Sequence, residues 1–338
     1  MMSDVVRVLG QRFIAAVPIL LVVSMLLFAV LRMIPVDPLA LSVPPNATIE
    51  EIDKIRHDMS FDRPIAVQYV VWLQNTLHLD FGRSIQHRES VAGLIAETLP
   101  ATIELALFAI VIASALGLVG GLYLFHLRGR PGEVVVDLAS TAIMSLPEFL
   151  WGLLFILLFG VALDWLPFIG RLSPAFSRPV HSGFLLIDAL IDRRFDVFFD
   201  ALKHMILPAF ALGLSFSPPI MRVLRSSLHD VYAEDYIQQA RLRGVGEWRI
   251  LVRHATKNAI LPTLTLMGVQ FSFLFGGTLL IEVIYSYPGM GNLMVEAVRN
   301  ADLPVTQAVG LVYCIAVLFI NAVVDAVYLV LNPKLRRR

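Results

Sequence analysis

Six apolar stretches, each long enough to cross a lipid bilayer, constrain the fold of this chain more than any other feature. A spanning helix needs about 20 consecutive apolar residues, because its backbone must satisfy its own hydrogen bonds inside the hydrocarbon. Apolar residues make up 57% of the chain and charged residues 16%, whereas soluble domains have about 45–50% and about 25%. The chain is therefore predicted to be an all-α membrane protein with six transmembrane helices. The predicted spans are residues 13–33, 99–125, 135–163, 203–224, 260–283 and 306–331.

The first stretch follows Arg7 and Arg12, a pattern that secretory signal peptides share. Its apolar core has about 20 residues, whereas the apolar region of a signal peptide has about 7–15. It also continues directly into residues 32–35 without a small-residue cleavage site. Residues 1–33 are therefore predicted to be a retained signal-anchor that forms the first span.

The distribution of Lys and Arg over the connecting segments predicts the orientation of the spans. Cytoplasmic loops of membrane proteins carry an excess of both residues. With the N-terminus inside, the short inner segments hold most of the bases, while the longer outer segments hold fewer bases and more acids. Both termini are therefore predicted to be cytoplasmic. The inner bases are Arg7, Arg12, Arg128, Arg130, those from Arg222 to Lys257, Lys334, Arg336, Arg337 and Arg338.

Two outer segments carry helical signals of their own. In the first, residues 34–98, Thr48 and Glu51 form a capping box, and a further helix is predicted at residues 64–77 with proline in its first turn. In the second, the apolar run 183–191 is too short to span and is predicted to lie at the interface or over the mouth of the bundle. The predicted divisions are the anchor 1–33, the outer segment 34–98, a five-span core 99–331 that includes the polar inner segment 225–259, and a basic tail 332–338.

The longest polar interruption on the base-rich side is residues 230–262. Residues 230–243 are predicted to form one helix that Asp230 caps and Gly244 stops, because glycine readily adopts the left-handed conformation at a helix end. A solvated connector is the plainer alternative, but a loop of this length usually has a function. The helix is therefore predicted to dock a cytoplasmic partner. Its apolar face comprises Val231, Ala233, Tyr236, Ile237 and Ala240.

The sequence contains none of the short motifs that would indicate catalysis. It lacks GxxxxGK[ST], HExxH, GxSxG and CxxC, so the corresponding ATP, zinc, serine and redox chemistries are not predicted. The eight histidines include no pair at i,i+4, and the single cysteine, Cys314, lies in an apolar run. A formal net charge of zero gives no indication of nucleic-acid binding. The chain is therefore predicted not to be an enzyme and to hold no metal or cofactor.

Two acids are candidates for lining a transport path, because ionisable residues inside spans are costly and usually functional. Glu148 lies in the middle of the third predicted span, where a charge costs about 2.5–3.5 kcal/mol on insertion scales. It is predicted to line the path and meet a substrate amine, and the alternative is a protonated, hydrogen-bonded interior residue. Glu282 sits near the outer end of a span, as Glu104 and Asp164 do, and a structural role is the alternative there.

Motifs along the whole chain resemble those of permease subunits of ABC importers, in the form of the first (B-type) permease of the dipeptide, oligopeptide and nickel branch. The cytoplasmic signature of these permeases is similar to residues 234–262. Gln238 and Gln239 depart from the general importer signature, which has Glu and Ala there, and Glu148 stands where a small or apolar residue is expected. The other matching motifs are Arg32-Met33-Ile34-Pro35, Asp37-Pro38, Asp80-Phe81-Gly82, Leu99-Pro100-Ala101-Thr102, Ser145-Leu146-Pro147, Ile206-Leu207-Pro208-Ala209, Glu282 with Tyr287-Pro288-Gly289-Met290-Gly291, Asp302-Leu303-Pro304 and Asn332-Pro333-Lys334.

The resemblance implies a type I ABC importer transmembrane fold in the bacterial inner membrane, surrounded by lipid. It implies a second homologous permease, a periplasmic substrate-binding protein, and two ATP-binding subunits that carry the ATP. Short peptides are the expected cargo, and nickel, glutathione and oligosaccharides are the alternatives. The residues implied in ATPase docking are Glu234, Asp235, Tyr236, Ile237, Ala240, Arg241 and Gly244.

Two other classes of membrane protein are weighed against the importer. A proton-coupled secondary transporter could use the same acids, but it would more often show repeated halves, and the sequence shows no repeat. A structural or assembly protein would bind partners without transporting anything. The importer is the favoured interpretation.

Overall fold

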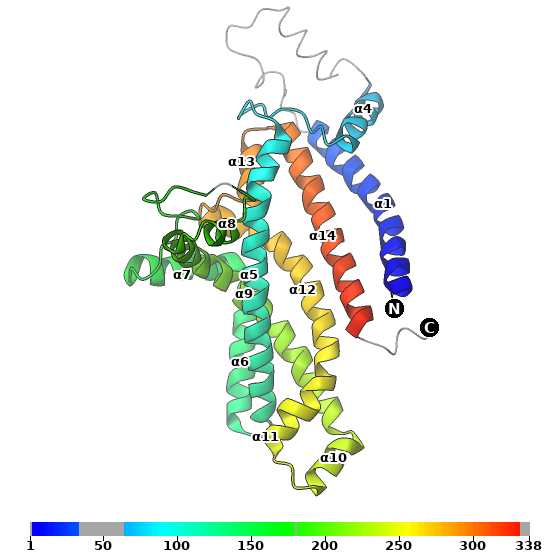
Figure 1. Ribbon diagram of the computed structural model, residues 1–338, viewed down its shortest axis with the longest axis vertical. Helices are drawn as coiled ribbons and strands as arrows, with labels where there is room; N and C mark the ends of the chain where they lie inside the picture. Colours follow the sequence, from blue (N-terminus) through cyan, green and yellow to red (C-terminus); the bar gives the residue numbers. More distant parts are fainter. Residues whose placement is uncertain (1, 34–63, 180, 332–338) are drawn as a thin grey trace, which may run out of the picture.

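The structure, a computed structural model, describes residues 2–33, 64–179 and 181–331, and every regular element within these ranges is helical. Five helices are each long and apolar enough to cross a membrane, and a sixth crossing is formed by a bent pair. The predicted all-α membrane fold is thereby confirmed (Figure 1). The helices are α1 (Met2–Met33), α4 (Ile65–Leu77), α5 (Val91–His126), α6 (Pro131–Ser145), α7 (Glu148–Phe155), α8 (Leu185–Ile191), α9 (Phe195–Tyr232), α10 (Asp235–Leu242), α11 (Glu247–Arg249), α12 (Thr256–Ile284), α13 (Met290–Arg299) and α14 (Leu303–Leu331), with π-helical turns η1 (Ile156–Ala162) after α7 and η2 (Ile250–Ala255) before α12.

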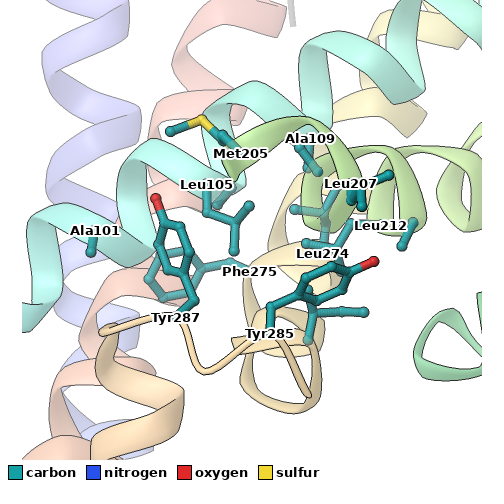
Figure 2. Packing of buried hydrophobic residues seen from close by; sticks show 14 of the residues in the cluster. Ala101, Leu105, Ala109, Met205, Leu207, Leu212, Leu274, Phe275, Tyr285 and Tyr287 are labelled. Atoms are coloured by element: carbon teal, nitrogen blue, oxygen red, sulfur yellow. The ribbon is translucent and has the colours of Figure 1, made fainter. Parts of the chain in front are cut away.

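Helices α5 and α9 lie side by side at the centre of the bundle, and α12 packs against both. The approach is close because glycine lines it: a Cβ added at Gly117 would lie 2.6 Å from the side chain of Ile220. These three helices and the loop after α12 enclose a core of buried apolar side chains, shown in Figure 2. Its labelled members are Ala101, Leu105, Ala109, Met205, Leu207, Leu212, Leu274, Phe275, Tyr285 and Tyr287.

The third crossing is broken, which corrects the prediction of one continuous span over residues 135–163. Helix α6 and the α7–η1 helix meet at 98°. Leu146 is extended (φ −103°, ψ 130°) because the residue before a proline is sterically disfavoured in the helical region. Across the break, the Trp151 indole donates a hydrogen bond to the Ile143 carbonyl oxygen at 3.2 Å. The break therefore leaves the start of a second half-helix, at Glu148, inside the membrane span.

The fourth crossing shows the opposite behaviour. Helix α9 continues through Pro208, Pro218 and Pro219. Pro218 has no N–H for the carbonyl oxygen of Leu214, and the Ser217 hydroxyl donates to that oxygen at 2.9 Å instead. A neighbouring side chain thus compensates for a lost backbone hydrogen bond, as spanning helices require.

Short helices lie in the connections between the crossings. The helix predicted at residues 64–77 is α4, and the apolar run 183–191 forms α8. Helix α13, between α12 and α14, was not predicted. The capping box of Thr48 and Glu51 lies outside the described residues, as does the basic tail 332–338.

Asp188 of α8 organises the loop before it. Its buried carboxyl group accepts hydrogen bonds from the backbone N–H groups of His181, Ser182 and Gly183 and from the Ser182 hydroxyl. Burial opposes the ionisation of this group, but the hydrogen bonds to Ser182, His181 and Gly183 outweigh it and lower the pKa of Asp188. The loop that contains residues 181–183 is therefore held by hydrogen bonds to the ionised carboxylate of Asp188.

Helices α1 and α14 pack together at the edge of the bundle. An ion pair of 2.7 Å joins Arg12 of α1 to Asp325 of α14. In Figure 1 the start of α1 and the end of α14 both point toward the end of the bundle that carries α10. This arrangement is what an even number of crossings produces.

Candidate functional site

The polar segment between α9 and α12 forms a short surface helix, α10, at one end of the bundle (Figure 1). The single helix predicted over residues 230–243 is wrong at its start, because α9 extends past Asp230 and α10 begins only after an extended Glu234. Asp230 therefore does not cap α10. The predicted stop is confirmed: Gly244 follows the helix at φ +74°, a conformation that glycine adopts without side-chain strain.

One face of α10 fixes the helix to the bundle. Ile237 has no exposed surface and Ala240 only 9%, and burial of an isoleucine side chain contributes about 1.5–3 kcal/mol. These two residues were predicted to contribute to docking, and this is corrected, since they hold α10 in place from its inner side. They pack in a cluster with Phe125, Leu224, Leu228, Ile250, Leu251, Ala255 and Ala259.

The other face of α10 and the start of α11 are exposed, and this surface is more apolar than the sequence indicated. Leu242 is 89% exposed and Trp248 62%. Exposed large apolar side chains in one place mark interaction surfaces. Leu242 was missed because it lies off the apolar stripe of the predicted helix, and Trp248 because it lies beyond the predicted end of that helix, although single apolar residues in a polar segment were an available signal. The predicted docking residues that the structure exposes are Glu234, Asp235, Tyr236, Arg241 and Gly244.

A cluster of aromatic and charged side chains connects α10 to the ends of α5 and α9. The guanidinium carbon of Arg128 lies 4.4 Å from the ring centre of Phe125 and 4.5 Å from that of Tyr232. Arg241 of α10 pairs with Glu247 at 2.6 Å, and this hydrogen bond raises the pKa of Arg241. Arg241 also lies over the Tyr232 ring, and Glu247 lies 4.0 Å from Arg128. These contacts connect α10 and α11 to the ends of α5 and α9.

Glu148, the first candidate for the path, is the first residue of α7, at the bend of the third crossing rather than inside a continuous helix. Its side chain is half-buried. It lies against α12, because a Cβ added at Gly277 would be 3.3 Å from its Oε1 atom. The structure therefore brings this acid to the junction of two spans.

Glu282, the second candidate, is completely buried. Its carboxyl group accepts hydrogen bonds from the Thr102 hydroxyl (2.7 Å) and from the N–H groups of Gly291 (2.7 Å) and Asn292 (3.3 Å). A Cβ at Gly289 would lie 2.4 Å from the same carboxyl group, so the loop needs glycine to approach it. Glu282 joins α5, α12 and α13 and faces no opening in this structure, which does not support its predicted place in the path.

Comparisons with known proteins agree over the whole length of the chain. Residues 110–337 match the family described as binding-protein-dependent transport system inner membrane component, and residues 5–106 match its N-terminal counterpart. The di/tripeptide transport system permease protein DppB of Pseudomonas aeruginosa (strain UCBPP-PA14) is 36% identical over an alignment of 343 residues that covers all of both chains. The glutathione transport system permease protein GsiC of Escherichia coli (strain K12) is 33% identical over 327 residues, 96% of this chain and 97% of its own.

Among solved structures, the MetNI methionine ABC transporter in an inward-facing conformation contains a similar chain. The TM-score is 0.52 at 16% identity, and the match covers 71% of this chain and 96% of the other. At this identity the match shows the fold alone.

Several helices long and apolar enough to cross a membrane, with an exposed, partly apolar helix between two of them, define a multi-pass membrane protein. The chain belongs to the binding-protein-dependent transport system inner membrane component family, which matches well over half of its residues. It is a permease subunit of an ABC importer.

Proposed function

We propose that this permease carries short peptides across the bacterial inner membrane. It pairs with a second, homologous permease to form the translocation path, and a periplasmic binding protein delivers the peptide. The energy comes from two ATP-binding subunits docked on α10. The relatives named as di/tripeptide and glutathione permeases support this cargo class, since glutathione is itself a small peptide.

The observation that carries the proposal is the docking surface. Leu242 and Trp248 expose apolar side chains to water at the end of the bundle, which is unfavourable unless a partner covers them. The chain has no phosphate-binding motif, so ATP must act through another subunit. A helix that is clamped to α5 and α9 and exposed on its other side is suited to receive that subunit's movement.

The same surface supports an orientation. Lys and Arg are concentrated at the end of the bundle that carries α10, and the positive-inside rule assigns such an end to the cytoplasm. Both ends of the chain then lie in the cytoplasm, where the ATP-binding subunits are. Helices α4, α8 and α13 lie on the periplasmic side, where the binding protein docks.

Docking is tested by a charge placed on this surface, with a matched control. Leu242→Arg puts a cation where we expect apolar contact, and Leu77→Arg makes the same change at a leucine that is 75% exposed on α4, far from α10 in Figure 1. In the assembled complex, Leu242→Arg should lose the co-purifying ATP-binding subunits, and Leu77→Arg should retain them. Equal retention by both variants would show that the partner docks elsewhere.

The cargo is tested by uptake of dipeptides into vesicles that hold the complex, with the binding protein outside and ATP inside. Uptake should stop when the ATP-binding subunits are inactivated. If peptides are not taken up but a loaded binding protein still stimulates ATP hydrolysis, the importer assignment stands and the cargo is glutathione, nickel or an oligosaccharide.

A further inference from the structure

Glu148 is a carboxyl group inside a membrane crossing to which the described part of the chain assigns no hydrogen bond or ion pair. It begins α7, directly after the 98° bend that divides the third crossing. It is half-buried, so neither bulk water nor the protein interior fully surrounds it. Acids at such depth normally pair with another group or line a path for a substrate or ion. Glu148 is therefore open to a partner from outside this chain.

The surroundings of Glu148 are suited to a positively charged group. A Cβ added at Gly277 of α12 would lie 3.3 Å from Glu148 Oε1 and 3.6 Å from the ring of Phe216 on α9. The carboxyl group and the aromatic ring therefore face the same stretch of bare backbone. A carboxylate forms strong charge-assisted hydrogen bonds with an ammonium group, and an aromatic ring attracts the same cation through its face.

Space for a ligand exists beside these two groups. A Cβ added at Gly276 would meet no atom within 4 Å. Gly276 belongs to an exposed side of α12 that also includes Phe273, 65% exposed, and Leu280, 46% exposed. An exposed side on a central helix of one permease subunit is where a path shared with a second subunit would run.

We propose that Glu148 and Phe216 form an ammonium site that binds the protonated amino terminus of the peptide during translocation. The proposal rests on the peptide transport function proposed above. The site recognises the amino terminus, which every linear peptide carries. It does not distinguish the side chains of the peptide, because glycine, not a side-chain pocket, lies opposite the carboxylate. The membrane subunit itself is thereby specific for peptides with a free amino group.

The test uses the complete complex in vesicles and follows uptake of one free-amine dipeptide, ATP hydrolysis stimulated by the loaded binding protein, and thermal unfolding. Glu148→Gln keeps the shape and removes the charge, so uptake should fall about tenfold or more, while stimulated ATP hydrolysis and the unfolding temperature remain at wild-type values. Phe216→Leu should lower uptake by about two- to fivefold. Glu97→Gln, at an exposed acid of α5, is the control and should change nothing.

The outcomes separate this site from the transport function. Wild-type uptake by Glu148→Gln would overturn the ammonium site and leave the importer intact. A loss of uptake together with a lower unfolding temperature would make Glu148 a structural residue and equally overturn the proposal. If the wild-type complex itself shows ATP hydrolysis but no dipeptide uptake, the peptide function fails, and the ammonium site fails with it.

Discussion

Glu282 gives the sharpest stability prediction because its partners are buried and few. Glu282→Ala removes the acceptor of the Gly291 and Asn292 N–H groups in the first turn of α13, while Thr102 keeps a hydrogen bond to the Met290 N–H. A buried donor left without an acceptor costs about 1–3 kcal/mol, and this applies to the Gly291 N–H. The half-buried Asn292 N–H adds less, because water can reach it. The cavity left by the side chain adds to this cost.

The assay is thermal unfolding of the purified complex in lipid discs, together with hydrogen exchange at the start of α13. Glu282→Ala should unfold at a clearly lower temperature and expose the Gly291 amide. Glu282→Gln retains one acceptor oxygen and the volume, so it should lie between alanine and wild type. Glu97→Ala is the exposed control. Wild-type unfolding and protection in Glu282→Ala would refute the idea that this carboxyl group holds α13 to α5 and α12.

Two further predictions concern α10 and α8. Ile237→Ala, on the buried face of α10, should destabilise the complex by about 2–5 kcal/mol and loosen the coupling of ATP hydrolysis to uptake. Gln238→Ala, on the exposed face, is the control and should not change stability. Equal unfolding temperatures of the two variants would argue against the packing of Ile237 between α10 and the bundle. The pKa of Asp188 is lowered on folding, so its contribution to stability is fully present above the ordinary aspartate pKa of about 3.9 and is lost as the pH falls through the lower, folded value. The difference in unfolding temperature between wild type and Asp188→Asn should accordingly shrink only in this acidic range, and a difference that persists unchanged below it would show that ionisation is not what holds the loop.

The number and placement of the crossings followed from the sequence because each crossing must be continuously apolar. The effect of each proline on its helix could not be predicted from the sequence. Pro147 and Pro218 lie in similarly apolar stretches, yet only Pro147 ends its helix. At Pro218 the preceding serine supplies the missing donor, whereas Leu146 before Pro147 has no such group and becomes extended. Which outcome occurs depends on whether a nearby side chain can satisfy the freed carbonyl oxygen, and hydropathy does not contain this information.

The position of the α10 segment in the chain was predictable from the sequence, but which of its faces packs against the bundle was not. Helical spacing identified Ile237 and Ala240 as one apolar face, and the structure shows that face. An apolar face on a surface helix can be buried by the chain itself or by a partner, and the sequence pattern is the same in both cases. Leu242 was overlooked for the converse reason, since a lone apolar residue next to a helix end fits no periodic pattern.

The pairing of α1 with α14 has a consequence for how this protein is made. Helix α1 leaves the ribosome well before α14, the helix against which it packs. During synthesis α1 must therefore remain stable in lipid alone, which its almost uninterrupted apolar surface allows. Arg12 meets Asp325 only when α14 has inserted. The contact between α1 and α14 therefore forms late in membrane insertion, and a defect placed there would appear as failed maturation in the membrane before transport could be measured at all.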